Sequence, residues 1–198
     1  MKRLVLTFDD GPDPIYTQKI LDVLKDNKVK ATFFVVAQNA DSFPEYITRI
    51  KKEGHDIALH SLEHRHALLS SYRYMKYDFS KSTELLQKLD CDIHFYRPPW
   101  GARNIFTRSF VKRYNLHMVL WDIMIGDWKA GKDPEQLAEQ LHKRAFDGAI
   151  ICLHDGCEKY GGAKGAPFNT IDALKIAIPK LKEEGYNFVT VEEFFVHA

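Results

Sequence analysis

Two adjacent carboxylates, Asp9 and Asp10, follow an apolar run that begins at Leu4, and Gly11-Pro12 comes directly after them. Neighbouring side chains of a strand point to opposite faces, so the two carboxylates are expected to serve different purposes, one in binding and one in chemistry. The alternative is a turn in which Asp-Gly-Pro merely ends a buried strand. Residues elsewhere in the chain must decide between these two interpretations.

Two histidines, His60 and His64, have the spacing that places two imidazoles on one face of a helical turn. Such a pair is common on surface helices and in protein cores. One carboxylate from the Asp9/Asp10 pair would extend it to a His, His, Asp set with open positions, which suits a catalytic divalent metal. Zinc is the first expectation from the ligand types, and cobalt, nickel or manganese would fit the same set.

Hydrolysis is the natural chemistry of such an ion, because it lowers the pKa of water from about 16 to near 7 and polarises a carbonyl group. The reaction also needs a base for the water proton, which the other member of the Asp9/Asp10 pair can supply. His154, directly after the apolar run 150–153, is the candidate acid for the leaving group. The alternative for His154 is an ordinary hydrogen-bonded histidine at a strand end.

Apolar runs alternate with amphipathic stretches along the chain, which predicts an α/β fold with parallel strands. The seven expected strands are the run from Leu4 and residues 31–36, 55–60, 93–96, 117–121, 149–153 and 187–189. The expected helices cover 15–27, 43–54, 74–89, 105–114, 134–146 and 171–184, with a short amphipathic tail from 191. Polar clusters follow the carboxyl ends of successive strands. This favours a distorted, seven-stranded (β/α) barrel of TIM-like type, with its active site at these ends, over a doubly wound sheet.

Composition is that of a globular chain, with 45% hydrophobic and 28% charged residues among 198, and one domain over 1–198 is expected. The formal net charge of +1 gives no electrostatic argument for nucleic acid or an anionic membrane, and carries no information on oligomeric state. Cys91, Cys152 and Cys157 lack CxxC spacing, which indicates free thiols and neither a disulfide framework nor a thiolate zinc site. No signal peptide or membrane span is visible, so the expected location is cytoplasmic, or secreted if a leader was removed.

Five segments resemble, in order, the motifs of the polysaccharide deacetylase domain, which is the NodB-homology domain of carbohydrate esterase family 4. They are Thr7–Pro12, His60–His64, Arg97–Gly101, Asp127-Trp128 and Leu153–Asp155, and the resemblance extends from Leu4 to about Phe194. It implies a metal-dependent hydrolase that removes N-acetyl groups from an N-acetylglucosamine-containing glycan, of the peptidoglycan or chitin type. The implied partner is therefore an acetylated glycan.

The resemblance also orders the carboxylate pair. Asp9 becomes the general base and Arg97 its ion-pair partner. His154 becomes the acid, oriented and charged by Asp127. The implied metal ligands are Asp10, His60 and His64.

For the substrate, the resemblance implies that Trp100 donates a backbone N–H to the oxyanion and forms a wall of the groove. Trp128 and Leu153 would line a small apolar pocket for the acetyl methyl group. One position departs from the family: Met124 stands where a carboxylate is usual, three residues before the Asp-Trp pair. Asp122 has the same strand parity and is a candidate to compensate, about 6.6 Å away along the strand.

Other functions remain compatible with these motifs. One is an amidohydrolase of the same superfamily that acts inside the cell on a small amide or a sugar conjugate, and another is an O-acetyl xylan esterase. A glycan-binding module without catalysis is supported only by Met124. Trp100, Tyr160 and Trp121 are candidates for stacking on sugar rings, and the Gly-rich segment 156–168 is expected to form a mobile lip over the site.

Overall fold

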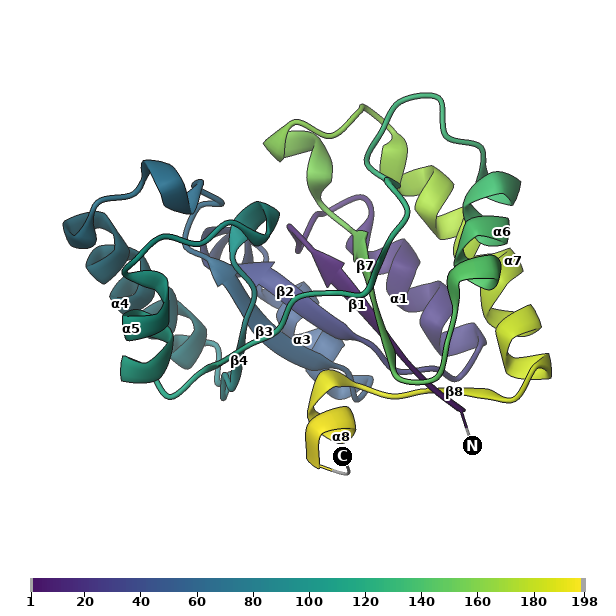
Figure 1. The fold of residues 1–198 in the computed structure, drawn as a ribbon, viewed down its shortest axis with the longest axis horizontal. Helices are drawn as coiled ribbons and strands as arrows, with labels where there is room; N and C mark the ends of the chain where they lie inside the picture. The colour runs from purple at the N-terminus through teal and green to yellow at the C-terminus, as the bar shows by residue number, and fades with distance from the viewer. Residues whose placement is uncertain (1, 197–198) are drawn as a thin grey trace.

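The computed structural model describes residues 2–196 and contains one parallel sheet curved into an incomplete barrel (Figure 1). Its strands are β1 (Lys2–Asp9), β2 (Thr32–Val36), β3 (Asp56–Ser61), β4 (Phe95–Tyr96), β5 (His117–Met118), β6 (Ile123–Met124), β7 (Ala149–His154) and β8 (Tyr186–Phe188). Seven of them follow the order β5-β4-β3-β2-β1-β7-β6, and β8 pairs with the start of β1. The sheet is open between β5 and β6, so the predicted distorted (β/α) barrel is confirmed.

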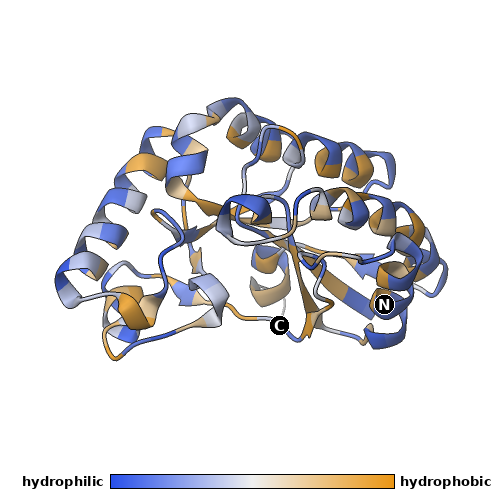
Figure 2. Cartoon of the chain, turned by 90° about the horizontal axis from the view of Figure 1, so that it is seen from above, coloured by the Kyte–Doolittle hydropathy of each residue, from blue (hydrophilic) through white to orange (hydrophobic). Residues whose placement is uncertain are grey.

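All helices but the last cover the outer side of this sheet, and the last packs against the cluster inside it. Figure 2 shows that the helices carry both hydrophilic and hydrophobic residues. They are α1 (Thr17–Asp26), α2 (Ala37–Ser42), α3 (Pro44–Lys52), α4 (Tyr72–Lys88), α5 (Thr107–Arg113), α6 (Pro134–Arg144), α7 (Ala166–Glu183) and α8 (Val191–Val196). Three short 3-10 helices lie in the loops, η1 (Ala67–Leu69), η2 (Pro99–Gly101) and η3 (Cys157–Tyr160). No helix within residues 2–196 is both long and apolar enough to cross a bilayer.

Strand β1 runs through the middle of the sheet and is buried on both faces. Its outward side chains, Leu4, Leu6 and Phe8, belong to the large core between the sheet and the helices. Val5 points the other way, into a smaller cluster inside the curved sheet that also contains Phe34. This alternation decides which residues reach the barrel interior.

Apart from the short 3-10 helices, the described residues contain two elements that the sequence did not predict, α2 and β6. Helix α2 follows β2 without an intervening turn and its N-cap, Val36, makes no side-chain cap, so no start signal marks it. Strand β6 has only 2 residues, too few to show alternation.

Part of the segment 156–168 is helical, although it was expected to be a loop. Its first half contains η3, and α7 begins at Ala166 and not near Ile171. Pro167 in the first turn is a helix-start signal that the surrounding glycines obscure.

Candidate active site

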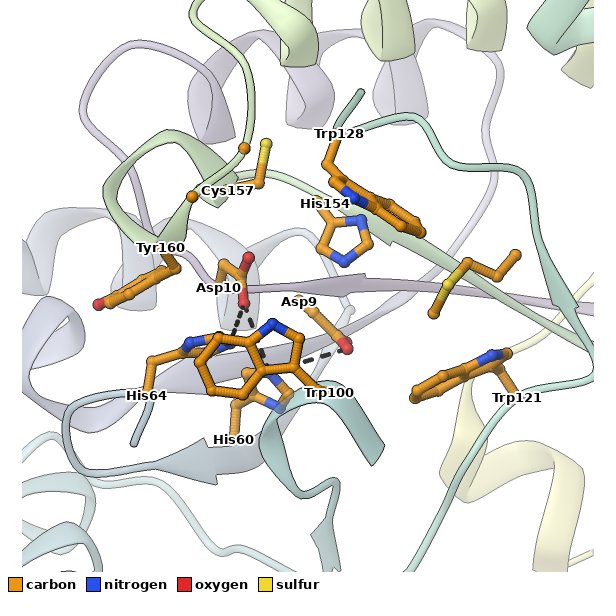
Figure 3. A pocket seen from close by; sticks show the side chains of 13 residues that line it. Asp9, Asp10, His60, His64, Trp100, Trp121, Trp128, His154, Cys157 and Tyr160 are labelled. Atoms are coloured by element: carbon orange, nitrogen blue, oxygen red, sulfur yellow. Dashed lines mark ion pairs between the residues drawn. The ribbon is translucent and has the colours of Figure 1, made fainter. Parts of the chain in front are cut away.

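Asp10, His60 and His64 meet at the carboxyl ends of β1 and β3 (Figure 3). The Oδ1 atom of Asp10 lies 2.9 Å from Nε2 of His64 and 3.4 Å from Nε2 of His60. All three side chains are buried, and this Oδ1 has no hydrogen-bond partner among the described residues. A buried carboxylate oxygen facing two imidazole nitrogens fits a divalent cation, so the residues match the predicted ligand set.

The two histidines converge through a turn and not on the helical turn that their spacing suggested. His60 is part of β3, and the chain then passes through Ser61 and His64 with positive φ angles of 132° and 57°. The His64 N–H donates to Ser61 Oγ over 2.8 Å and closes this turn. Positive φ is uncommon outside glycine, so the surrounding structure holds the backbone in a costly conformation here.

Each of the three candidate ligands is held by a neighbouring residue. His60 Nδ1 lies 2.8 Å from the Arg97 carbonyl oxygen, so Nε2 faces Asp10. The His64 ring stacks on Tyr160 with centroids 4.3 Å apart. The Asn39 amide donates to the Asp10 carbonyl oxygen over 2.9 Å and to the Tyr160 hydroxyl over 3.0 Å.

The protonation states also suit a cation. Burial alone would raise the pKa of Asp10, but the adjacent imidazoles of His60 and His64 hold it well below its usual range. Burial lowers the pKa of His64, and the nearby Asp10 only partly offsets this. Asp10 is therefore ionised and His64 tends to be neutral, which are the forms that bind metals.

Asp9 faces a different partner from Asp10. Its Oδ1 accepts a hydrogen bond of 2.7 Å from Nη1 of Arg97, whose side chain is fully buried. The same Nη1 donates to Thr7 Oγ1, while Nε donates to the carbonyl of Val119. A guanidinium fixed in this way binds one oxygen of the Asp9 carboxylate and leaves Oδ2 facing the site.

His154 forms a second charged pair. Its Nδ1 lies 3.0 Å from Oδ1 of Asp127, whose other oxygen accepts the His154 backbone N–H and the Thr170 hydroxyl. Burial lowers the pKa of His154, but the charge and hydrogen bond of Asp127 outweigh it, with help from Asp10 and Asp9, and raise it to about 9. His154 therefore carries a proton at neutral pH.

Asp155 links β7 by hydrogen bonds to the turn that follows β1. Its Oδ1 accepts the Gly11 N–H over 3.0 Å and its Oδ2 accepts the Thr17 hydroxyl over 2.6 Å. A Cβ atom on Gly11 would lie 2.1 Å from this carboxylate, so only glycine fits. The turn keeps Asp10 at a φ of 81° and thereby aims its side chain at the histidines.

A pocket of about 250 Å³ opens over these groups. Its lining consists of Asp9, Asp10, His60, His64, Trp100, Trp121, Met124, Trp128, His154, Cys157, Tyr160, Gly161 and Gly162. Trp128 packs edge-on against His154, with ring centroids 5.0 Å apart, and the half-exposed Trp100 packs edge-on against His64 at 4.3 Å. Two aromatic walls thus flank the charged groups (Figure 3).

Leu153 does not line this pocket, contrary to expectation. Its side chain is fully buried in the core between sheet and helices. The physical reason is strand alternation, because His154 faces the interior and its neighbour must face outward. The inward residue before His154 is Cys152, whose thiol donates to Asp9 Oδ2 over 3.4 Å.

Asp122 does not take the place of the carboxylate that Met124 replaces. Its Oδ2 accepts the backbone N–H of Ile150 over 2.9 Å, and the residue is exposed at the sheet edge. Met124 itself lines the pocket near Trp128. The charge of His154 is balanced by Asp127 instead.

The sequence did not reveal Asn39, Asp155 or Thr170 as supports of the site. Asn39 lies in the unpredicted helix α2, and Thr170 lies in the first turns of α7, which begins earlier than expected. Asp155 is part of a recognised segment, but nothing in the sequence connects it with Gly11. Asp155 and Gly11 lie together because the carboxyl ends of β1 and β7 are aligned in the sheet.

Known proteins with similar sequences belong to the family that the motifs indicated. Residues 1–119 match the family model for polysaccharide deacetylase. A peptidoglycan-N-acetylglucosamine deacetylase of Bacillus cereus is 34% identical over 97% of this chain and 87% of its own length.

Solved structures give the same result. A crystal structure of a peptidoglycan N-acetylglucosamine deacetylase, in complex with a naphthalenyl benzamide compound, superposes with a TM-score of 0.87 at 32% identity, covering 97% of this chain and 87% of that one. A family 4 acetyl xylan esterase from Clostridium thermocellum, in complex with a cobalt ion, reaches 0.86 at 34% identity over 98% and 91%. The chain belongs to the polysaccharide deacetylase family, the carbohydrate esterase family 4 enzymes with a NodB-homology domain.

Proposed function

We propose that this protein is a metal-dependent deacetylase that removes N-acetyl groups from an N-acetylglucosamine-containing glycan of the peptidoglycan or chitin type. The observation that carries the proposal is the convergence of Asp10, His60 and His64 beside the separate pairs Asp9–Arg97 and His154–Asp127. A binding module would have no need for a fixed base and a charged acid around a cation site. We expect the domain to span residues 1–198.

Asp10, His60 and His64 would hold the divalent ion. When bound, such an ion polarises the acetamide carbonyl and lowers the pKa of a water molecule. Zinc is the proposed ion because imidazole and carboxylate ligands suit it, and cobalt, nickel or manganese would fit the same ligands.

Asp9 is the proposed general base. Oδ2 would accept the proton of the attacking water, because Oδ1 is held by Arg97. Arg97, being fully buried with fixed hydrogen bonds, would prevent the Asp9 carboxylate from turning toward the cation site.

His154 is the proposed general acid. Its Nδ1 is held by Asp127, so the proton would be delivered from Nε2 to the leaving nitrogen of the sugar. Trp128 lies against the His154 ring and would form one side of the acetyl pocket. Trp100 would donate its backbone N–H to the developing oxyanion and place its ring along the sugar.

The relatives support an N-acetylated glycan as substrate. The similar proteins include a peptidoglycan-N-acetylglucosamine deacetylase, and the similar structures also include an acetyl xylan esterase, so an O-acetyl substrate is the second candidate.

Acetate release from a substrate panel tests the proposal. The panel contains peptidoglycan, N-acetylglucosamine oligomers, acetylated xylan and a small acetamide, each with the zinc-loaded protein. We expect the N-acetylglucosamine polymers or oligomers to be the best substrates, and a His60→Ala variant to lose both metal and turnover. Release from xylan alone, or from the small acetamide alone, would contradict the proposed substrate class.

A further inference from the structure

Cys152 forms a second metal-capable cluster with Asp9 and His154, next to the proposed ligands. One ligand atom of each residue lies within 4.8 Å of those of the others. The cysteine side chain is fully buried, and its thiol donates to Asp9 Oδ2 over 3.4 Å. The predicted mechanism gives this thiol no task.

The free atoms of the cluster point to one place. Arg97 occupies Oδ1 of Asp9, which leaves Oδ2, and Asp127 occupies Nδ1 of His154, which leaves Nε2. In Figure 3 the lower edge of the His154 ring is directed toward Asp9. These two atoms and the Cys152 sulfur thus supply a nitrogen, an oxygen and a sulfur ligand from neighbouring strands.

The spacing of the sulfur and oxygen ligands fits a tetrahedral ion. With zinc–sulfur and zinc–oxygen bonds of about 2.3 and 2.0 Å, two tetrahedral ligands lie about 3.5 Å apart. The observed separation of Cys152 Sγ and Asp9 Oδ2 is 3.4 Å, and the two atoms are joined by a hydrogen bond.

We propose that Asp9, Cys152 and His154 form a second, inhibitory zinc site, which is filled only when zinc exceeds the one ion held by Asp10, His60 and His64. Binding exchanges two protons for the ion: the sulfur–hydrogen bond of Cys152 and the Nε2–hydrogen bond of the protonated His154 break, sulfur–zinc and nitrogen–zinc bonds form, and both protons leave to solvent. The ion occupies the base and the acid together, so turnover stops. This effect on activity rests on the proposed function.

Ligand chemistry makes the inhibition selective. A thiolate favours zinc over manganese or magnesium, which prefer oxygen ligands. Excess zinc should therefore inhibit at concentrations at which excess manganese does not.

Zinc binding to the whole protein tests this inference. Equilibrium dialysis should give two zinc ions per chain for the unaltered protein at high free zinc, and one for Cys152→Ser. Activity of each protein is compared with its own value at one equivalent, and we expect the second ion to lower it at least about tenfold in the unaltered protein only. Cys157→Ser is the matched control, because Cys157 is a buried thiol that lines the pocket outside the cluster, and it should behave like the unaltered protein.

Cobalt supplies a readout that does not depend on turnover. A thiolate-to-cobalt charge-transfer band should appear with the second equivalent, and it should be absent in Cys152→Ser while thermal melting shows that this variant is folded. A second ion that binds Cys152→Ser equally well, the absence of any second ion, or loss of the band in Cys157→Ser would overturn the inference. If no substrate were deacetylated at one equivalent, the proposed function would fail, and the stoichiometry and the band would still decide this site.

Discussion

Asp9 and Asp10 are neighbours in the chain, yet their carboxylates have separate partners. Asp10 lies against two imidazoles, and Asp9 lies against Arg97. This is the pairing that the resemblance implied. The positive φ of Asp10 produces the division, because it turns one carboxylate out of the strand direction that the other follows.

Replacing Asp9 with Asn should remove the base and leave the metal ligands in place. We expect turnover to fall about 10²- to 10⁴-fold, the usual contribution of general base catalysis. Metal content should stay near one ion per chain, measured by elemental analysis. Retained turnover, or loss of the metal, would place Asp9 in another role.

The raised pKa of His154 predicts how activity depends on pH. Asp127 raises this pKa above its unfolded value, to about 9, so the proton is present below that value and is lost as pH rises through it. Activity should therefore fall on the alkaline side. In Asp127→Asn the charge is gone, and we expect the alkaline limb of kcat/KM to move to lower pH. If the alkaline limb of kcat/KM did not move, a group other than His154 would determine it.

At the scale of elements, the site lies where the carboxyl ends of several strands meet. Strand β1 supplies the proposed base, β3 and the turn after it supply the two histidines, and β7 supplies the proposed acid. Asp155 connects β7 with the turn after β1, and Asn39 connects α2 with the same turn. These two buried contacts set the distances between the catalytic groups.

Removing the Asp155 carboxylate should loosen this junction. In Asp155→Ala the Gly11 N–H and the Thr17 hydroxyl lose a buried acceptor, at a cost of about 1–3 kcal/mol for each group. We expect a lower melting temperature and a higher zinc dissociation constant, both measurable by calorimetry. Asp172→Ala, on the exposed face of α7, is the matched control and should change neither. Unaltered zinc affinity in Asp155→Ala would show that Asp10 needs no such support.

At the scale of the whole molecule, the cation site ties together parts that are far apart in sequence. The Oδ1 atom of Asp10 is buried and has no hydrogen-bond partner among the described residues, so a cation would satisfy it. An ion that binds only the folded state stabilises it, by about 2.7 kcal/mol at a hundredfold excess over its dissociation constant.

Metal removal should therefore lower the melting temperature. For a chain of this size the shift corresponds to roughly 5–10 °C, since each kcal/mol moves it by about 2–4 °C. Calorimetry of zinc-loaded and chelator-treated protein measures the difference. His60→Ala should show a much smaller zinc-dependent shift, and an equal shift in that variant would place the stabilising ion elsewhere.

The sequence alone determined the fold class and the residue types of the site. Alternating apolar and amphipathic stretches indicated parallel strands and helices, and the polar groups after the strands indicated which end is active. Asp9, Asp10, His60, His64, Arg97, Asp127 and His154 could be picked out because their motifs are short and local.

Only the tertiary structure decided the contacts between distant segments. It placed Leu153 in the core between sheet and helices and directed the buried Cys152 thiol at Asp9 Oδ2. It also joined Asp155 to Gly11 across the β1–β7 pair. Sequence patterns report periodicity along one element, whereas these contacts depend on the register between elements, which packing of the whole barrel sets.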